Sequence, residues 1–182
     1  MSHECCNPKK DMKNKKGGVD KFLLSIVLLT IISLVVVVLL ATRSGGAKAE
    51  IEADTQVETI VTENKYDWGT IDINGGIATK SFPIKNSGSS VLKLFNVKTS
   101  CMCTTAQLKT SEITSKKYKM HESSSDVIEV KPGETAELIV EFDPAFHGPS
   151  GVGPITRIIT MSTNDTKNST LTFNLTGNVV KN

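Results

Sequence analysis

The sequence AELIVEF, residues 136–142, alternates between apolar and mostly polar side chains. Successive side chains of a β-strand point to opposite faces of its sheet, so this segment has one apolar face and one mostly polar face. Residues 171–179 repeat the alternation, with Leu171, Phe173 and Leu175 on the apolar side. Both segments are therefore predicted to be strands that bury one face.

Five further segments are predicted as short strands from their apolar content: residues 56–61, 77–84, 91–97, 127–130 and 155–161. Turn sequences separate the segments, namely Asn74-Gly75-Gly76, Asn86-Ser87-Gly88, Lys131-Pro132-Gly133-Glu134 and Asn164-Asp165. About seven short strands at this spacing are typical of an all-β fold, an immunoglobulin-like β-sandwich. A single closed sheet is the alternative, but the unequal connections favour the sandwich. We assign this domain to residues 56–182.

A different pattern precedes the strands. Residues 22–41, FLLSIVLLTIISLVVVVLLA, contain no charged residue, Gly or Pro. A helix of this length reaches about 30 Å, the thickness of the hydrocarbon core of a bilayer. A buried core helix is the alternative, but such helices seldom lack a polar face over this length. The sequence thus predicts one N-terminal transmembrane helix.

The charges beside this run predict its orientation. Residues 1–21 carry six lysines against three acidic residues, a net charge of +3, whereas only Arg43 and Lys48 follow closely. Because positive flanks remain in the cytoplasm, residues 1–21 are expected to form a cytoplasmic basic tail. The chain is then a single-pass protein of the cell membrane with an extracytoplasmic C-terminal domain. Residues 42–55 mix Gly, Ala and charge and are predicted to be a tether.

Two kinds of processing compete with an uncleaved signal anchor. A lipoprotein needs a cysteine just after the apolar run, and residues 43–50 contain none. Ala47-Lys48-Ala49 fits a small-x-small cleavage pattern that would make Ala49 the cleavage site. The apolar run is nevertheless longer than the roughly 7–15 residues of a cleavable signal, which favours the anchor.

The charge of the main domain argues against nucleic acid as a partner. From Glu50 onward, twelve lysines and Arg157 are opposed by sixteen acidic residues, so the domain is mildly acidic. Nucleic-acid binding normally needs a basic surface. The expected partners are the membrane, through residues 22–41, and a protein of the cell envelope.

Five sequence blocks resemble, in the same order, those of a bacterial protein family. They are YDWGTI (66–71), SFPIKNSG (81–88), VKTSCMCT (97–104), KPGE (131–134) and VEFDP (140–144). The ordered set resembles the domain of unknown function family 1573 over about residues 57–180. The resemblance implies an exported domain of immunoglobulin-like fold, with no settled activity. This chain has Met102 where the family commonly has Gly, and its segment 104–126 is long enough to predict an extra loop.

Cys101 and Cys103 are the candidate chemical site. Residues two apart in an extended strand point to the same face, so both thiols are expected to emerge together. Three interpretations remain open: a structural or inert pair, which could be closed as a small-ring disulfide, a soft-metal site for Cu(I), and a redox-active pair. Candidate additional ligands are Met102, Met120, His121 and His147.

Other candidate chemistry is weak. Cys5 and Cys6 lack the spacing of a four-ligand zinc site and are expected to be reduced. His121 and His147 lie near no nucleophile motif, so no catalytic residues are assigned and the chain is predicted not to be an enzyme. We expect a binding or scaffolding domain without a cofactor. The alternative is a copper-handling or thiol-redox protein that uses Cys101 and Cys103.

Overall fold

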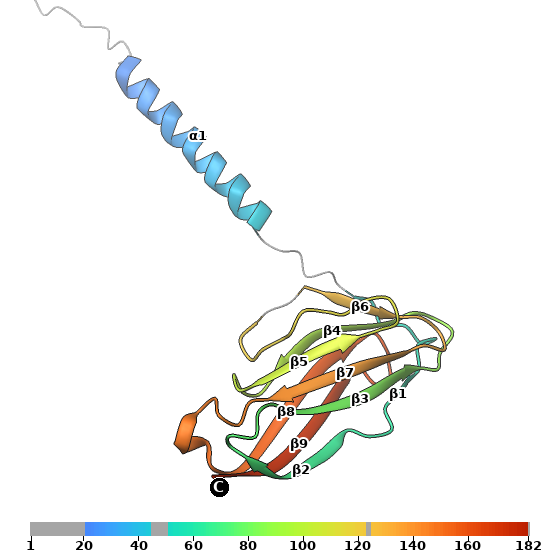
Figure 1. The fold of residues 1–182 in the computed structure, drawn as a ribbon. Helices are drawn as coiled ribbons and strands as arrows, with labels where there is room; N and C mark the ends of the chain where they lie inside the picture. The colour runs from blue at the N-terminus through green and yellow to red at the C-terminus, as the bar shows by residue number, and fades with distance from the viewer. Residues whose placement is uncertain (1–20, 45–50, 123–124, 182) are drawn as a thin grey trace, which may run out of the picture. The chain divides into compact units, whose positions relative to one another are not determined.

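The computed structural model describes residues 21–44, 51–122 and 125–181 of the chain (Figure 1). The chain divides into two compact units, Met1–Ala47 and Lys48–Asn182. Cys5 and Cys6, in the predicted cytoplasmic tail, lie outside the described residues, and so does Ala49, the alternative cleavage site.

The described residues of the first unit form the helix α1 (Lys21–Ser44). Its side chains from residue 21 to residue 37 are exposed. The hydroxyl groups of Ser25, Thr30 and Ser33 each donate a hydrogen bond to the carbonyl three residues earlier, which satisfies them within the helix. In the described parts of the chain, we find no helix with both the length and the apolar character needed to cross a membrane.

The second unit is a β-sandwich, and nine strands lie in its described residues. The strands are β1 (Thr59–Ile60), β2 (Lys65–Asp72), β3 (Ala78–Asn86), β4 (Leu92–Thr99), β5 (Thr104–Lys109), β6 (Val127–Val130), β7 (Thr135–Phe142), β8 (Gly153–Thr163) and β9 (Thr170–Val180). They form a four-stranded sheet of order β1-β3-β7-β5 and a five-stranded sheet of order β2-β9-β8-β4-β6 (Figure 1). The predicted two-sheet β fold is confirmed, with nine strands instead of about seven.

The core between the sheets follows from the alternation in the sequence. Along β7, the apolar face at Ala136, Leu138 and Val140 is fully buried. On β9 of the opposite sheet, Phe173 is also fully buried, and its ring lies 5.0 Å from that of Phe82 on β3. Burial of apolar surface is the main favourable term in folding, so these inward faces hold the two sheets together.

Two strands were not predicted because their sequences lack a clear apolar alternation. Strand β2 lies at the edge of its sheet, pairs with β9 in parallel, and has only one buried residue, Ile71. Strand β5 buries Thr104, Ala106 and Leu108, of which only Leu108 is a large apolar residue. The segment 104–126, predicted as a loop, therefore begins with a strand.

The rest of that segment folds back onto β5. Tyr118 and Ala106 exchange two backbone hydrogen bonds, of 3.0 Å and 2.7 Å. Tyr118 is 1% exposed and belongs to the main core cluster. This return covers part of the outer edge of β5 and leaves fewer unpaired backbone groups there.

The predicted tether, residues 42–55, differs from the structure at both ends. Its first residues, up to Ser44, continue helix α1. Near its other end, the amide of Asp54 donates a 2.7 Å hydrogen bond to the carbonyl of Asn164 in the β8–β9 connection. Residue 54 is therefore part of the folded domain.

Candidate functional site

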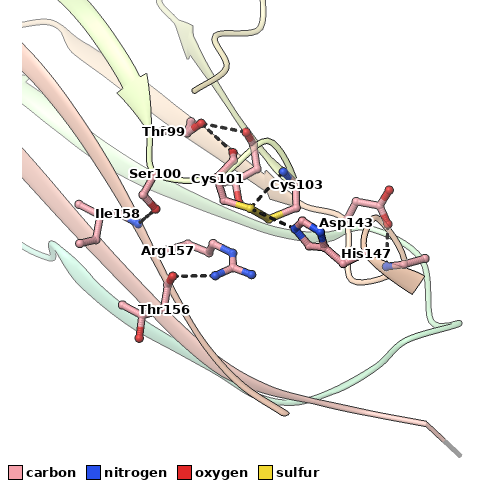
Figure 2. The surroundings of a disulfide bond; sticks show 11 residues. Thr99, Ser100, Cys101, Cys103, Asp143, His147, Thr156, Arg157 and Ile158 are labelled. Atoms are coloured by element: carbon pink, nitrogen blue, oxygen red, sulfur yellow. Dashed lines mark hydrogen bonds between the residues drawn. A yellow bond between two sulfur atoms is a disulfide. The ribbon is translucent and has the colours of Figure 1, made fainter. Parts of the chain in front are cut away.

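The two cysteines of the Cys-x-Cys motif lie in the turn between β4 and β5, where the chain crosses from one sheet to the other (Figure 2). They form a disulfide bond, with their Cα atoms 5.3 Å apart. The local structure is a turn instead of the expected extended strand, and a disulfide, one of the alternatives left open for the pair, closes it. In this state neither sulfur is a thiolate, which is the form that binds metals and acts as a nucleophile.

Local hydrogen bonds hold this turn. The hydroxyl of Thr99 donates to the carbonyls of Cys101 and Thr104, at 3.1 Å each. The amide of Cys103 lies 3.3 Å from Sγ of Cys101 and donates to it. Met102 is not among the described residues with a positive φ, so the turn does not need the Gly that is common in the family.

His147 reaches the disulfide from the segment that follows β7. The amide of Asp143 donates a 2.9 Å hydrogen bond to the carbonyl of Cys103, and the amide of Ala145 donates to Oδ1 of Asp143 at 2.9 Å. These bonds fix the segment beside the turn. The result is a distance of 3.5 Å between Nε2 of His147 and Sγ of Cys101 (Figure 2).

Cys101, Cys103 and His147 form a group whose ligand atoms all lie within 4.8 Å of one another. Burial differs among them: Cys103 is 3% exposed, Cys101 is half-buried and His147 is exposed. Among the other candidate ligands, His121 is not part of this group. Met120 and His121 lie on the connection after β5, and Met102 points its side chain to solvent with 41% exposure.

An aromatic and cationic cluster lies beside the turn. Phe142, at the end of β7, belongs to the same apolar cluster as Cys103. The ring of Trp68 stacks on that of Phe142 at 5.7 Å, and the guanidinium of Arg157 lies 5.0 Å from the centroid of Phe142. Burial lowers the pKa of Arg157 from its ordinary value, although a guanidinium keeps its charge in proteins.

Two donors in this cluster lack acceptors. Nε of Arg157 and Nε1 of Trp68 are buried and have no hydrogen-bond partner among the described residues. Nη1 of Arg157 donates to the carbonyl of Thr156 at 2.8 Å. In Figure 2 the guanidinium points toward the region of the disulfide and His147. Sequence reasoning did not single out Arg157 or Phe142, because their proximity depends on the pairing of distant strands.

Fold and site together define a two-sheet β-sandwich domain with a disulfide-closed Cys-x-Cys turn. The chain belongs to the family DUF1573, described as protein of unknown function, whose profile matches residues 59–179. The resemblance seen in the sequence blocks is thereby confirmed.

Solved structures are similar to this chain at low sequence identity. A protein of unknown function from Porphyromonas gingivalis W83 is 18% identical with a TM-score of 0.51, over 74% of this chain and 51% of that one. This chain therefore spans about half the length of that protein. A human CEP192 ASH/PapD-like domain is 15% identical with a TM-score of 0.43, over 70% of this chain and 87% of that chain. No curated protein sequence matches the chain significantly.

Proposed function

We propose that this chain is a single-pass membrane-anchored protein whose immunoglobulin-like domain acts outside the cytoplasm as a binding or scaffolding module. The observation that carries the location is the Cys101–Cys103 disulfide. Disulfides form and persist in oxidising compartments and are rare in the cytosol. This proposal assigns no enzymatic activity and no cofactor to the domain.

The proposed anchor is the uncharged run at residues 22–41. It is supported by the exposed apolar side chains of α1 between Phe22 and Val37, since lipid accommodates such a surface without cost. The hydroxyl groups within the run are already bonded to its own backbone, so they do not require water. The lysines before the run support an N-terminus in the cytoplasm.

A binding or scaffolding role suits the architecture of the domain. A packed sandwich is a rigid support from which loops and strand edges contact a partner. The mildly acidic surface favours a protein of the cell envelope over nucleic acid.

The anchor is tested by introducing charge into α1. Replacing both Leu29 and Ile32 with Lys is expected to release the chain from bacterial membranes into the alkaline-carbonate supernatant, since each Lys at the centre of a span costs about 2.5–3.5 kcal/mol. The unmodified chain and a Leu29→Ile, Ile32→Leu control are expected to remain in the pellet. Release of all three proteins would refute the anchor.

A second candidate function is favoured by the convergence of Cys101, Cys103 and His147. We propose, as the alternative role, copper handling or thiol redox chemistry at the cysteine pair. After reduction, the domain is expected to show the two thiols and to bind one equivalent of Cu(I) against a competing chelator. Cys101→Ser is expected to abolish this stoichiometric binding. Unchanged binding in the variant would exclude the pair as the copper site.

A further inference from the structure

The turn between β4 and β5 and the segment after β7 bring two sulfur atoms and one imidazole nitrogen together. We infer that the Cys101–Cys103 disulfide is the closed state of a three-ligand Cu(I) site, which reduction opens and Nε2 of His147 completes. The inference rests on the copper-handling alternative proposed above. Beyond that role, the inference assigns His147 as the third ligand and makes copper binding depend on the oxidation state of the two cysteines.

The spacing of the three atoms fits one ion. Ligands about 2.0–2.3 Å from a metal in a trigonal plane lie about 3.5–4 Å from one another. Nε2 of His147 is 3.5 Å from Sγ of Cys101, and all three atoms lie within 4.8 Å. When the bond between the sulfur atoms is cleaved, they need only move apart to a similar separation. His147 is already in place.

The surrounding chain holds His147 in this position. The hydrogen bond from the amide of Asp143 to the carbonyl of Cys103 joins the segment directly to the cysteine turn. Within the segment, the amide of Gly148 donates to the carbonyl of Ala145 at 2.9 Å. The ring of Phe146 meets that of His147 edge to face at 5.0 Å. The imidazole is therefore oriented before any ion binds.

Ligand type and number favour Cu(I). Thiolates are soft ligands that select Cu(I) and zinc, and a structural zinc site takes four protein ligands, whereas the described group offers three. Two thiolates and one Cu⁺ leave a net charge of −1. The guanidinium of Arg157, held over Phe142 and directed toward this region, supplies a compensating positive charge (Figure 2).

The three proposed ligands differ in exposure, and this indicates the order in which an incoming ion meets them. Cys103 is 3% exposed and packs in the apolar cluster with Phe142, which keeps water from the inner side of the site. His147 is exposed and faces solvent on the outer side. An incoming ion thus meets His147 and the half-buried Cys101 first and the buried sulfur last.

Opening the site consumes two electrons from a thiol reductant, such as an exported dithiol protein. One reductant thiolate attacks Sγ of Cys101, forming a mixed disulfide as the bond to Cys103 breaks. The second reductant thiol attacks the mixed disulfide, so that the reductant leaves as a disulfide and Cys101 and Cys103 remain as thiols. Cu⁺ then replaces their two protons, which pass to solvent.

The test uses the full chain in detergent, with Cys5→Ser and Cys6→Ser in every protein compared, because the tail carries thiols of its own. Anaerobic titration against a chromophoric Cu(I) chelator is expected to show one equivalent bound by the reduced protein and none by the oxidised protein. Reduced His147→Asn is expected to bind about 100-fold more weakly, because loss of a direct ligand should cost no less than loss of an outer-shell partner, which costs about 10–100-fold. The control His121→Asn, whose imidazole is outside the group, is expected to bind as the parent does.

X-ray absorption at the copper edge is expected to show two sulfur ligands and one nitrogen ligand in the parent and to lose the nitrogen in His147→Asn. Circular dichroism checks that the variant is folded. No Cu(I) binding by the reduced parent would overturn the copper-handling function and the inference with it. Stoichiometric binding that is equal in the oxidised protein, or unchanged in His147→Asn, would overturn the inference alone.

Discussion

Replacing Phe82 with Ala is expected to lower the free energy of unfolding by about 3–5 kcal/mol, as is typical for removal of a buried aromatic ring. Phe82 is fully buried, and its ring contacts that of Phe173 across the two sheets. The substitution therefore leaves a cavity where the sheets meet. Urea unfolding of the chain, followed by the fluorescence of its single tryptophan, Trp68, measures the loss.

Phe146→Ala is the matched control for this prediction. Phe146 is 51% exposed, so removal of its ring should change the free energy of unfolding by no more than about 0.5 kcal/mol. Equal losses in the two variants would show that the Phe82–Phe173 contact is not central to the core.

Asp165→Asn is expected to lower the free energy of unfolding by about 2–3 kcal/mol at neutral pH. The carboxylate, 1% exposed in the β8–β9 connection, accepts hydrogen bonds from the amides of Thr59 and Lys167, at 2.8 Å each. Asn168 donates to it from both its amide and its side chain, at 3.3 Å and 3.0 Å. An Asn at this position replaces one acceptor oxygen with an NH2 group, which then faces an N–H donor of this network.

The same network makes stability depend on pH. Burial alone would raise the pKa of Asp165, but the hydrogen bonds outweigh it and lower the pKa from 3.8 to about 2. A lowered pKa in the folded state stabilises the protein above the unfolded pKa, and this stabilisation is lost as the pH falls from about 4 to about 2.

The shift corresponds to about 2 kcal/mol. Urea unfolding measures the free energy of unfolding of the parent and of Asp165→Asn at each pH. The two values are expected to differ strongly at pH 7 and little at pH 2. If the two free energies of unfolding differed by the same amount at pH 7 and at pH 2, the role assigned to the charge would be contradicted.

The sequence predicted those strands whose inward faces are apolar. In strands β7 and β9 the buried positions follow the apolar alternation of the sequence closely. Only one face of each strand can bury Leu138 or Phe173, so the pattern determines which face points inward. The pattern missed β5, where a small polar residue, Thr104, occupies an inward position. It also missed β2, whose alternation is interrupted by an irregularity between Asp67 and Thr70.

The candidate site was predicted in part. The Cys-x-Cys motif identified Cys101 and Cys103, and His147 was one of four additional candidates. Its selection depends on the register of β5 with β7, in which Thr104 pairs with Phe142. This register places the turn before β5 beside the segment after β7. Without a prediction of β5, nothing in the sequence separated His147 from His121.

In the proposed topology, the folded domain of residues 56–182 lies outside the cytoplasm. Protease added to bacterial spheroplasts that carry the chain with a C-terminal tag tests it most directly. We expect loss of the tagged domain while a cytoplasmic control protein survives. If the domain remains intact until detergent opens the bilayer, and is then digested, the proposed topology is wrong.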